Sequence, residues 1–456
     1  LSVIISLYMF FDFNKQIGLS SFKSNNIESI VPYVKLINQE YIIDLKDRNE
    51  NKLKSNTEDE LARNHSIIEY AVKVKNTTIG FWNGDKTTSP IQGSYKYISN
   101  VSKVFSQWPE SLPFPCYPPK KNAQDIDKFR YGIQFVKIPK CASSTSSGIA
   151  LRIAHRHGET KSIAAAKQIC SVQYTHESAR YRSYKLRDIN KSFLWTIIRE
   201  PTSRYVSEFQ HFKIARDKRY RNLSSLQIDK LMREDLKNLQ IYPRAGDMMY
   251  YLSTEAIKRR RLAPMYDKGY KIKNINVFEE IVTEILNDYN FIGTAERLDE
   301  SLVLLRLLLD LDAGDIIYLS SKTNGGYDDG RSNEGCVLIP KPNISEPTKQ
   351  LFSSEAYIKF QYGDHILYEA VNRSIDETIE SVGFERFKKA LDEHKHLMAL
   401  ANEECLPNAV FPCSKNGVRQ TKMAATNCYW DDSGCGYPCL DKLSEKWEKE
   451  RTSQLP

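Results

Sequence analysis

The strongest evidence for the fold of this chain is the segment 135–145, FVKIPKCASST. It runs from a short apolar strand through a turn at Pro139 and Lys140 into small hydroxyl residues that lead into a helix. Such a turn directs backbone N–H groups, a lysine and hydroxyls to one point, where a phosphate can lie at the helix N-terminus. The nucleotide P-loop pattern G-x-x-x-x-G-K-[ST] is absent, since Cys141 follows Lys140 and the next glycine is Gly148. The segment therefore predicts a phosphate site other than a P-loop.

A second strand-to-helix turn lies at residues 199–207, REPTSRYVS, directly after the apolar run FLWTII. Arg199 leaves the strand, Pro201 favours the start of a helix, and Ser207 lies about two helical turns further on. A guanidinium and a hydroxyl so placed can hold one phosphate together. Each turn alone is also compatible with a structural role, whereas the two in this order strengthen the functional interpretation of both.

Predicted strands alternate with predicted helices from about residue 129 onward. The strands are predicted at 133–136, 193–198 and 290–293, and the run 316–320 closes the pattern as a further strand. The helices are predicted at 145–157, 202–215, 275–286 and 299–311. This alternation predicts an α/β fold in which a parallel sheet is flanked by helices.

The segments outside the predicted core, 129–400, differ in composition. Residues 1–13, LSVIISLYMFFDF, are too short to span a bilayer, which takes about 20 residues. We interpret them as a signal-anchor remnant, with a signal peptide and a buried strand as open alternatives. Residues 14–128 are interpreted as a polar stem with a helical patch at 57–70, followed by an irregular lead-in that contains Trp82 and Trp108.

The last predicted segment, 401–456, is a Cys-rich tail that disulfides are expected to staple. Zinc is the competing interpretation, because Cys435 and Cys439 are four apart, although no histidine lies near them. The odd total of nine cysteines leaves at least one thiol free or paired between chains. The tail cysteines are Cys405, Cys413, Cys428, Cys435 and Cys439.

Glycosylation sequons indicate the cellular compartment of the protein, and the net charge indicates the kind of partner that it binds. N-x-[ST] sequons favour an oxidising, lumenal setting. The net charge of +8 favours acidic partners, although excess lysine is often only a solvated face. The basic clusters at 180–182, 216–221 and 258–261 could receive an acidic glycan. Nothing supports nucleic-acid binding, since there is no aromatic-basic platform or zinc-finger spacing. The sequons are at Asn64, Asn76, Asn100, Asn190, Asn222, Asn343 and Asn372.

The two turns together resemble the 5′- and 3′-phosphate motifs of the sulfotransferases that use 3′-phosphoadenosine 5′-phosphosulfate (PAPS). They are most similar to the Golgi carbohydrate sulfotransferases, which include the heparan sulfate 2-O- and galactose 3-O-enzymes. IPKCASST stands where that family has Ile-Pro-Lys-Thr-Gly-Gly-Thr or His-Lys-Thr-Ala-Ser-Ser-Thr, and REPTSRYVS where it has Arg-Asp-Pro-x-x-Arg-x-x-Ser. Residues 291–305, FIGTAERLDESLVLL, resemble a late strand and helix of the family. The resemblance covers roughly residues 131–324 and implies the P-loop-NTPase-like sulfotransferase fold.

The resemblance implies a role for each matching residue. Lys140 would neutralise charge on the bridging oxygen as the nucleotide leaves, and no metal would be needed. The 5′-phosphate would be held by Ser143, Ser144 and Thr145, next to Cys141, which replaces a family threonine and removes one hydroxyl contact. The 3′-phosphate would be held by Arg199 and Ser207. A later loop with Lys322 and Thr323 would also contact the donor.

The general base is expected to be His176, which lies between the two motifs where the relatives carry a catalytic histidine. Histidine titrates near neutral pH, which suits proton removal from a hydroxyl. A core or surface histidine is the structural alternative. Glu177 is the nearest rival, and Glu296 is a distant one that is expected to cap a helix or pair with Arg297.

These features predict a Golgi type II membrane enzyme with a lumenal catalytic domain and an acidic or neutral glycan acceptor. A homo-oligomer is an option, since the heparan sulfate 2-O relatives are trimeric. One alternative is a P-loop kinase-like transferase, which the Lys140-Cys141 pair disfavours. The other is an inactive secreted glycan-binding protein of the same fold, which the retention of Lys140, Arg199 and Ser207 disfavours.

Overall fold

The computed structural model describes only part of the chain, and all of that part falls within the compact unit Pro90–Pro456. The described residues are 100–116, 131–157, 172–173, 187–220, 222–239, 246–253, 276–320, 326–328, 336–411, 413–420 and 436–453. Several predicted features lie outside them: residues 1–13, the patch 57–70, Trp82, His176, Glu177, Lys322, Thr323, the basic clusters 180–182 and 258–261, Cys428 and Cys435.

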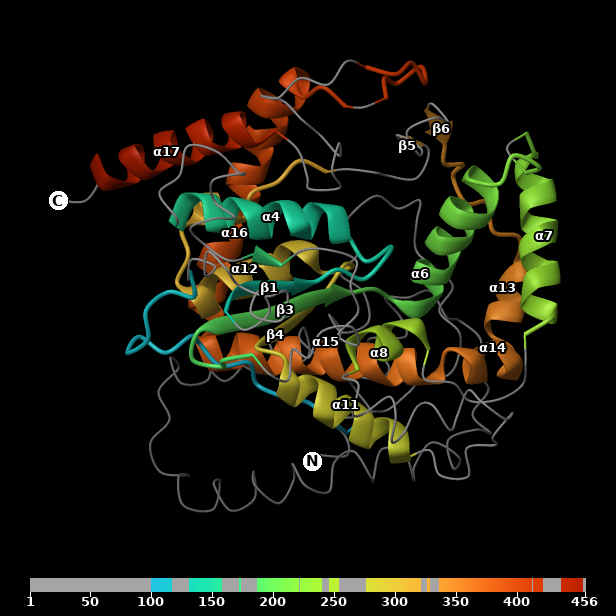
Figure 1. Ribbon diagram of the computed structural model, residues 1–456, viewed down its shortest axis with the longest axis horizontal. Helices are drawn as coiled ribbons and strands as arrows, with labels where there is room; N and C mark the ends of the chain where they lie inside the picture. The colour runs from blue at the N-terminus through green and yellow to red at the C-terminus, as the bar shows by residue number, and fades with distance from the viewer. Residues whose placement is uncertain are drawn as a thin grey trace, which may run out of the picture. The chain divides into compact units, whose positions relative to one another are not determined.

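Parallel strands form the sheet of the described residues, in the order β2-β1-β3-β4. The strands are β1 (Gly132–Val136), β2 (Val172–Gln173), β3 (Ser192–Ile198) and β4 (Phe291–Thr294). Every residue of β1, β3 and β4 is buried, which explains why these strands are nearly continuous apolar runs. Helices cover the sheet, with α4 (Ser143–His157) on one side and α11 (Asn276–Asp288) and α15 (Tyr362–Val382) on the other (Figure 1). The predicted α/β class with a parallel sheet is confirmed.

The segment predicted as one helix at 202–215 contains two consecutive helices of different types. It begins as α6 (Pro201–Glu208) and continues as a π-helix, η4 (Phe209–Ala215). The Glu200 carboxylate caps α6, accepting hydrogen bonds from the N–H groups of Thr202 and Ser203 at 2.9 and 2.6 Å. Helices near the other predicted positions are α4, α11 and α12 (Leu298–Leu309).

The remaining elements surround this core. The α-helices are α7 (Ser225–Lys237), α8 (Asp247–Leu252), α13 (Glu346–Phe352), α14 (Glu355–Phe360), α16 (Phe384–Leu400) and α17 (Tyr437–Ser453). The shorter elements are η6 (Ala313–Ile316), η7 (Ala401–Cys405), η8 (Leu406–Asn408) and the antiparallel pair β5 (Tyr327–Asp328) and β6 (Val337–Leu338). No helix among the described residues has the length and apolarity that a membrane span requires.

The strand predicted at 316–320 is wrong. Residues 313–316 form the 3-10 turn η6, and the chain from Ile317 to Ser320 has no regular structure. Its backbone groups bond to side chains instead of a neighbouring strand. The Arg152 guanidinium donates to the Ile317 carbonyl at 2.7 Å, and the Tyr318 N–H points to the sulfur of Met398 at 3.4 Å. The segment is buried and apolar, as a strand would be, so its composition alone is misleading.

The described part of the lead-in, residues 100–116, packs on the sheet without forming a helix or strand. Phe105 contacts Phe291 edge to face, with ring centroids 5.3 Å apart, and Trp108 contacts Phe193 in the same way at 6.1 Å. The Lys103 ammonium donates to the carbonyls of Leu286 and Tyr289, both at 2.8 Å, where α11 ends. The lead-in therefore contributes to the core beside β3 and β4.

Disulfides are present in the tail, as predicted. Cys405 pairs with Cys439, whereas Cys413 pairs with Cys336, which lies within the predicted core 129–400. The tail is therefore bonded to the body of the protein as well as to itself. Within the described part of the chain, Cys141 is the free cysteine.

Candidate functional site

The first turn, between β1 and α4, has an unusual backbone. Lys140 and Ala142 have φ angles of +67° and +52°, in the left-handed region that favours glycine. Each such residue costs about 1–3 kcal/mol, and strained positions of this kind cluster at ligand clamps. The Ser146 N–H and hydroxyl both donate to the Ala142 carbonyl, at 3.0 and 3.1 Å, and fix the start of the helix. The turn thus has left-handed backbone at two residues that are not glycine.

The hydroxyls predicted to hold a phosphate all lie in the first turn of α4. Ser143 and Thr145 are largely buried, and Ser144 is partly exposed. The Ser143 hydroxyl has no hydrogen-bond partner among the residues that the structure describes. No acidic side chain lies in this turn, so nothing there opposes an anion at the helix N-terminus.

The second turn lies directly beside the first. Arg199 Nη1 donates to the Lys140 carbonyl at 3.2 Å. This contact follows from the sheet, because β1 and β3 are parallel neighbours in which Val136 is opposite Thr196. After β1 the chain continues to β2 on one side, and β3 lies on the other. The two turns therefore meet at a topological switch point, where ligands bind in open α/β sheets.

The helix α8 supports both turns. The Met248 sulfur lies 3.8 Å from the Cys141 sulfur and 3.5 Å from the Arg199 backbone nitrogen. The start of α8 is fixed by the buried Asp364 carboxylate of α15, which accepts from the N–H groups of Met248 and Met249 at 3.0 and 2.7 Å. Burial raises the pKa of Asp364 to about 7, although the charge of Arg204 opposes this.

The carboxylate of Glu296 contacts the side chain of Arg199. It lies 3.7 Å from Arg199 Nε and accepts hydrogen bonds from the Glu200 N–H at 3.0 Å and the Tyr368 hydroxyl at 3.2 Å. Burial raises the pKa of Glu296, and the Arg199 charge opposes that increase. The expected pairing of Glu296 with Arg297 is wrong.

Arg297 has other partners, Glu300 at 2.6 Å and Asp376 of α15 at 2.8 Å. The contact of Glu296 with Arg199 was not predicted from the sequence. The available signal was its place directly after β4, at the same edge of the sheet as both turns. Parallel strands bring their carboxyl ends to one edge, so a carboxylate there can reach Arg199.

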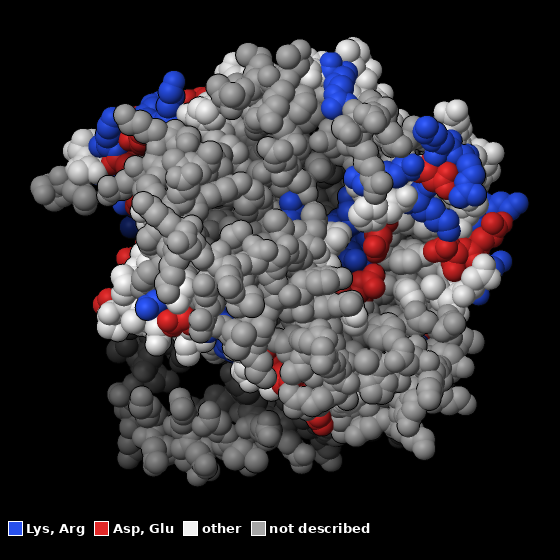
Figure 2. Space-filling model, viewed as in Figure 1, with Lys and Arg blue, Asp and Glu red and all other residues white. Residues whose placement is uncertain are grey.

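The far end of α6 also approaches the first turn. The Lys140 charge acts on Glu208, lowering the pKa that burial raises above its ordinary value. Ser207, the residue before it, is buried, and its hydroxyl has no hydrogen-bond partner in the described part of the chain. Figure 2 shows Lys and Arg atoms next to Asp and Glu atoms on this face of the molecule. The charges of Lys140 and Glu208 therefore interact, and Ser207 lies next to Glu208 in the chain.

Arg204 matches the second arginine of the family pattern Arg-Asp-Pro-x-x-Arg-x-x-Ser, but no role was predicted for it. Its side chain is buried and lies 3.2 Å from both Glu208 and Asp247. Its Nε has no hydrogen-bond partner among the described residues. Burial opposes its charge, but the carboxylates of Glu208 and Asp247 raise the pKa of Arg204 above its ordinary value. Arg204 therefore supplies a fixed positive charge beneath the two turns.

Cys141 faces away from the turn. Its side chain is 0% exposed, and burial raises the pKa of the thiol to about 12. A neutral thiol in the core cannot offer a phosphate the contact of the threonine hydroxyl that it was expected to replace. Only the Cys141 backbone N–H remains as a group that a ligand could use.

Replacing Cys141 with threonine is expected to destabilise the protein without improving phosphate binding. The new hydroxyl would be buried without a partner, which costs about 1–3 kcal/mol of unfolding free energy. Urea unfolding measures this loss, and Cys141→Ala is the control that changes volume without adding a polar group. Tighter binding of a phosphate ligand by Cys141→Thr would contradict this orientation of residue 141.

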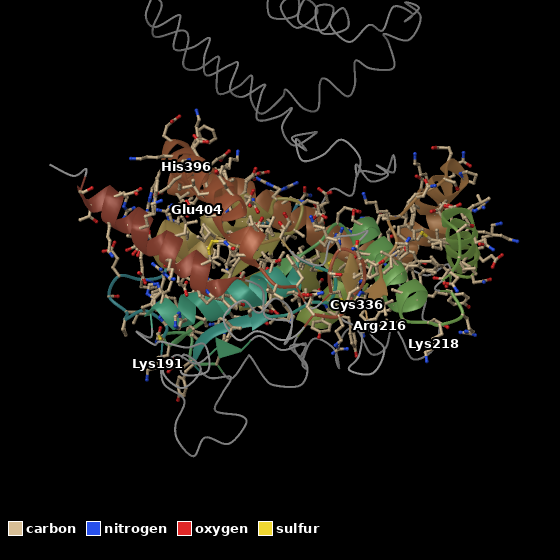
Figure 3. All side chains as sticks on the ribbon, turned by 90° about the horizontal axis from the view of Figure 1, so that it is seen from above. Lys191, Arg216, Lys218, Cys336, His396 and Glu404 are labelled. Carbon is tan, nitrogen blue, oxygen red and sulfur yellow. A yellow bond between two sulfur atoms is a disulfide. The ribbon has the colours of Figure 1, made fainter. Side chains whose placement is uncertain are left out.

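Beyond Ser207, the π-helix carries cations on aromatic rings. Lys213 lies 5.1 Å from the Phe209 ring and Arg216 lies 5.4 Å from the Phe212 ring, which is 43% exposed. Figure 3 shows Arg216 and Lys218 on the same edge of the molecule, on the side where Cys336 lies. The segment that continues α6 thus combines exposed aromatic surface with positive charge, and π-helices are frequent at functional sites.

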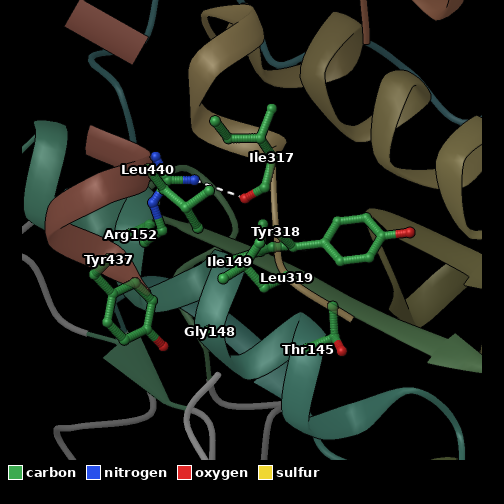
Figure 4. A pocket seen from close by; sticks show the side chains of 9 residues that line it. All are labelled: Thr145, Gly148, Ile149, Arg152, Ile317, Tyr318, Leu319, Tyr437 and Leu440. Atoms are coloured by element: carbon green, nitrogen blue, oxygen red, sulfur yellow. Dashed lines mark hydrogen bonds between the residues drawn. The ribbon is translucent and has the colours of Figure 1, made fainter. Parts of the chain in front are cut away.

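A small cavity lies between α4, the segment from Ile317 to Leu319 and α17 (Figure 4). It has room for about one water molecule, so a nucleotide does not fit in it. Its lining residues are Thr145, Gly148, Ile149, Arg152, Ile317, Tyr318, Leu319, Tyr437 and Leu440.

Known proteins match the part of the chain that contains both turns. Residues 126–316 match the family model described as "Sulfotransferase family". Galactose-3-O-sulfotransferase 3 of Homo sapiens is 27% identical over 238 residues, which cover 47% of this chain and 52% of the relative. The proteins of that name from Bos taurus and Mus musculus are 25% identical over the same shares. The chain spans about half the length of the curated relatives it matches. No solved structure matches.

Proposed function

We propose, on the match of residues 126–316 to the sulfotransferase family model, that the protein transfers a sulfuryl group from PAPS to a hydroxyl of a glycan. The observation that carries the proposal is the hydrogen bond from Arg199 Nη1 to the Lys140 carbonyl, 3.2 Å long. It joins the two turns that are predicted to bind phosphate at one edge of a parallel sheet, so one ligand with two phosphates would contact both turns.

The residues of both turns fit the phosphates of this donor. Ser143, Ser144 and Thr145 would hold the 5′-phosphate at the N-terminus of α4, where the helix dipole favours negative charge. Arg199 and Ser207 would hold the 3′-phosphate. The Nη2 of Arg199 has no hydrogen-bond partner within the described ranges, so it is available for a charge-assisted contact.

PAPS supplies an activated sulfuryl group, and the protein must stabilise the charge that develops as the nucleotide leaves. Lys140 would do so, because it stands at the strained turn between the two phosphate sites. Its ammonium is a compact point charge with three donors. Lys322 and Thr323 would contact the donor from a later loop.

His176 would accept the proton of the acceptor hydroxyl. It follows β2 by three residues in the chain, and β2 runs parallel to β1, so the chain leaves β2 at the edge where both turns lie. His176→Ala is expected to lower the rate of sulfate transfer by about 10²–10⁴-fold while 3′-phosphoadenosine 5′-phosphate (PAP) still binds. The exposed His396 provides the control variant, His396→Ala. Full activity of His176→Ala would overturn this assignment.

Glu296 would position Arg199 for the 3′-phosphate. Glu296→Gln keeps a side-chain acceptor but removes the charge that holds the guanidinium, so we expect PAP to bind about three- to tenfold more weakly. Calorimetric titration with PAP measures the change. Glu300→Gln, which removes a carboxylate from Arg297 instead, should leave the affinity unaltered. Equal affinities of the wild type and Glu296→Gln would refute this role.

The acceptor would be a glycan that lies along η4, where Phe212 offers a ring for stacking and Arg216 and Lys218 offer positive charge. The names of the relatives indicate galactose as one candidate sugar. Transfer of labelled sulfate from PAPS to a panel of neutral and acidic glycans tests the function. Labelling of at least one glycan is expected, and a panel without any labelled glycan would contradict the proposal.

The proposed setting is the lumen of the Golgi, with the protein held by an N-terminal anchor. The disulfides Cys336–Cys413 and Cys405–Cys439 support an oxidising compartment. The sequon residues Asn100, Asn190, Asn222 and Asn343 are exposed and so accessible to glycosylation.

A further inference from the structure

The buried guanidinium of Arg152 connects three parts of the protein. Arg152 lies in α4 and is 1% exposed. It donates to the carbonyls of Gly314 and Ile317 at 2.9 and 2.7 Å, and to the Asp441 carboxylate of α17 at 3.0 and 3.1 Å. Breaking such a buried, fully bonded ion pair is costly, because it leaves a charge without compensation.

The helix α17 approaches the turn η6 closely. A Cβ atom added at Gly314 would lie 2.4 Å from the Ser444 Cβ, so only glycine fits there. The Ser444 hydroxyl accepts from Arg152 Nη2 at 3.3 Å and lies 3.1 Å from the Gly314 carbonyl. One helical turn further on, Arg156 pairs with Asp315 at 2.5 Å and with Glu448. One face of α17 is therefore bonded to α4 and η6 together.

Apolar contacts and a disulfide complete this junction. Leu440 and Leu443 of α17 pack in one cluster with Ile317 and Leu319. The disulfide Cys405–Cys439 ties the start of α17 to the end of η7. The cavity of Figure 4 lies where α4, the segment from Ile317 to Leu319 and α17 meet, and Thr145 lines it.

We propose that α17 is a clamp for the donor site, and that Arg152 is the positioning residue through which it acts. This inference rests on the proposed function. Through Arg152, α17 sets the distance between α4, which starts with Ser143 and Thr145, and the buried segment from Ile317 to Leu319. The matched family segment ends at residue 316, so α17 lies outside it.

The clamp makes donor affinity depend on side chains remote from the donor. In Asp441→Ala, the Arg152 guanidinium loses its carboxylate and no longer fixes the Ile317 carbonyl. We expect the dissociation constant of PAP and the KM for PAPS to rise about tenfold, which is about the loss expected when one hydrogen bond to a charged phosphate is weakened. The kcat at saturating PAPS should change less than about twofold, because the reacting groups are untouched.

The test is calorimetric titration with PAP, together with PAPS kinetics, at a temperature where thermal unfolding shows each variant to be folded. Glu445→Ala, on the exposed face of α17, is the matched control and should bind PAP like the wild type. Ser444→Ala is the milder variant if Asp441→Ala does not fold, with an expected two- to threefold loss. Asp441→Glu should restore part of the affinity.

The outcomes separate the two proposals. If the wild type binds PAP and a folded Asp441→Ala or Ser444→Ala binds it equally well, α17 has only a structural role and this inference is overturned. If the wild type does not bind PAP, the proposed function fails, and the clamp fails with it.

Discussion

Replacing Lys140 with alanine is expected to lower kcat for sulfate transfer by about 10²–10³-fold, the usual cost of removing one preorganised group that stabilises developing charge. The residue has a left-handed backbone at the meeting point of the two turns, so its amine is placed by the strained turn. PAP binding should weaken much less, since the hydroxyls of α4 and Arg199 remain. Single-turnover transfer of labelled sulfate measures the chemical step.

Lys191 provides the matched control for this prediction. It lies next to the amino end of β3, opposite the edge that carries Lys140, and pairs with Asp188 at 3.7 Å. Lys191→Ala should therefore keep wild-type kcat, and Lys140→Arg should recover part of the loss because it keeps the charge. A Lys140→Ala variant with kcat within about threefold of wild type would exclude Lys140 from catalysis.

Arg199→Ala is expected to remove the preference of the protein for a nucleotide with a 3′-phosphate. Hydrogen bonds to charged groups contribute about 1.5–3 kcal/mol each, so the loss of the guanidinium should weaken PAP binding about 10- to 100-fold. AMP, which lacks the 3′-phosphate, should lose far less. Titration of both nucleotides into wild type and variant gives the difference.

The control for this comparison is Arg216→Ala, which removes a guanidinium directly after η4 instead of at the strand end. It should leave the ratio of PAP to AMP affinity unaltered. If Arg199→Ala weakens the two nucleotides equally, Arg199 supports the turn through the Lys140 carbonyl and does not recognise the 3′-phosphate.

The strands and the meeting of the two turns could be predicted because they depend on local patterns. The apolar runs of β1, β3 and β4 are continuous, and parallel neighbours bring their carboxyl ends together. The failure at 316–320 has a different origin. That run has the same apolar character, but its carbonyl at Ile317 is bonded by Arg152, far earlier in the chain.

The partners of the charged residues could not be predicted either, because they too depend on contacts between residues far apart in the chain. Glu296 is next to Arg297 in sequence, but Asp376 of α15 takes Arg297 and leaves Glu296 beside Arg199. The burial of the Cys141 thiol depends on Met248, which a tertiary contact brings to the turn. The π-helix that continues α6 could not be predicted either, because the sequence of residues 209–215 fits an α-helix equally well.

The most direct test of the two-phosphate site is the affinity of the wild-type protein for PAP against ATP. PAP carries the 3′-phosphate that Arg199 and Ser207 would hold, whereas ATP carries a triphosphate for which the chain lacks the P-loop glycines. Calorimetric titration should show PAP binding at least about 100-fold more tightly, a difference of about 2.7 kcal/mol. If ATP bound as tightly as PAP, the protein would not have the proposed site for a 5′- and a 3′-phosphate.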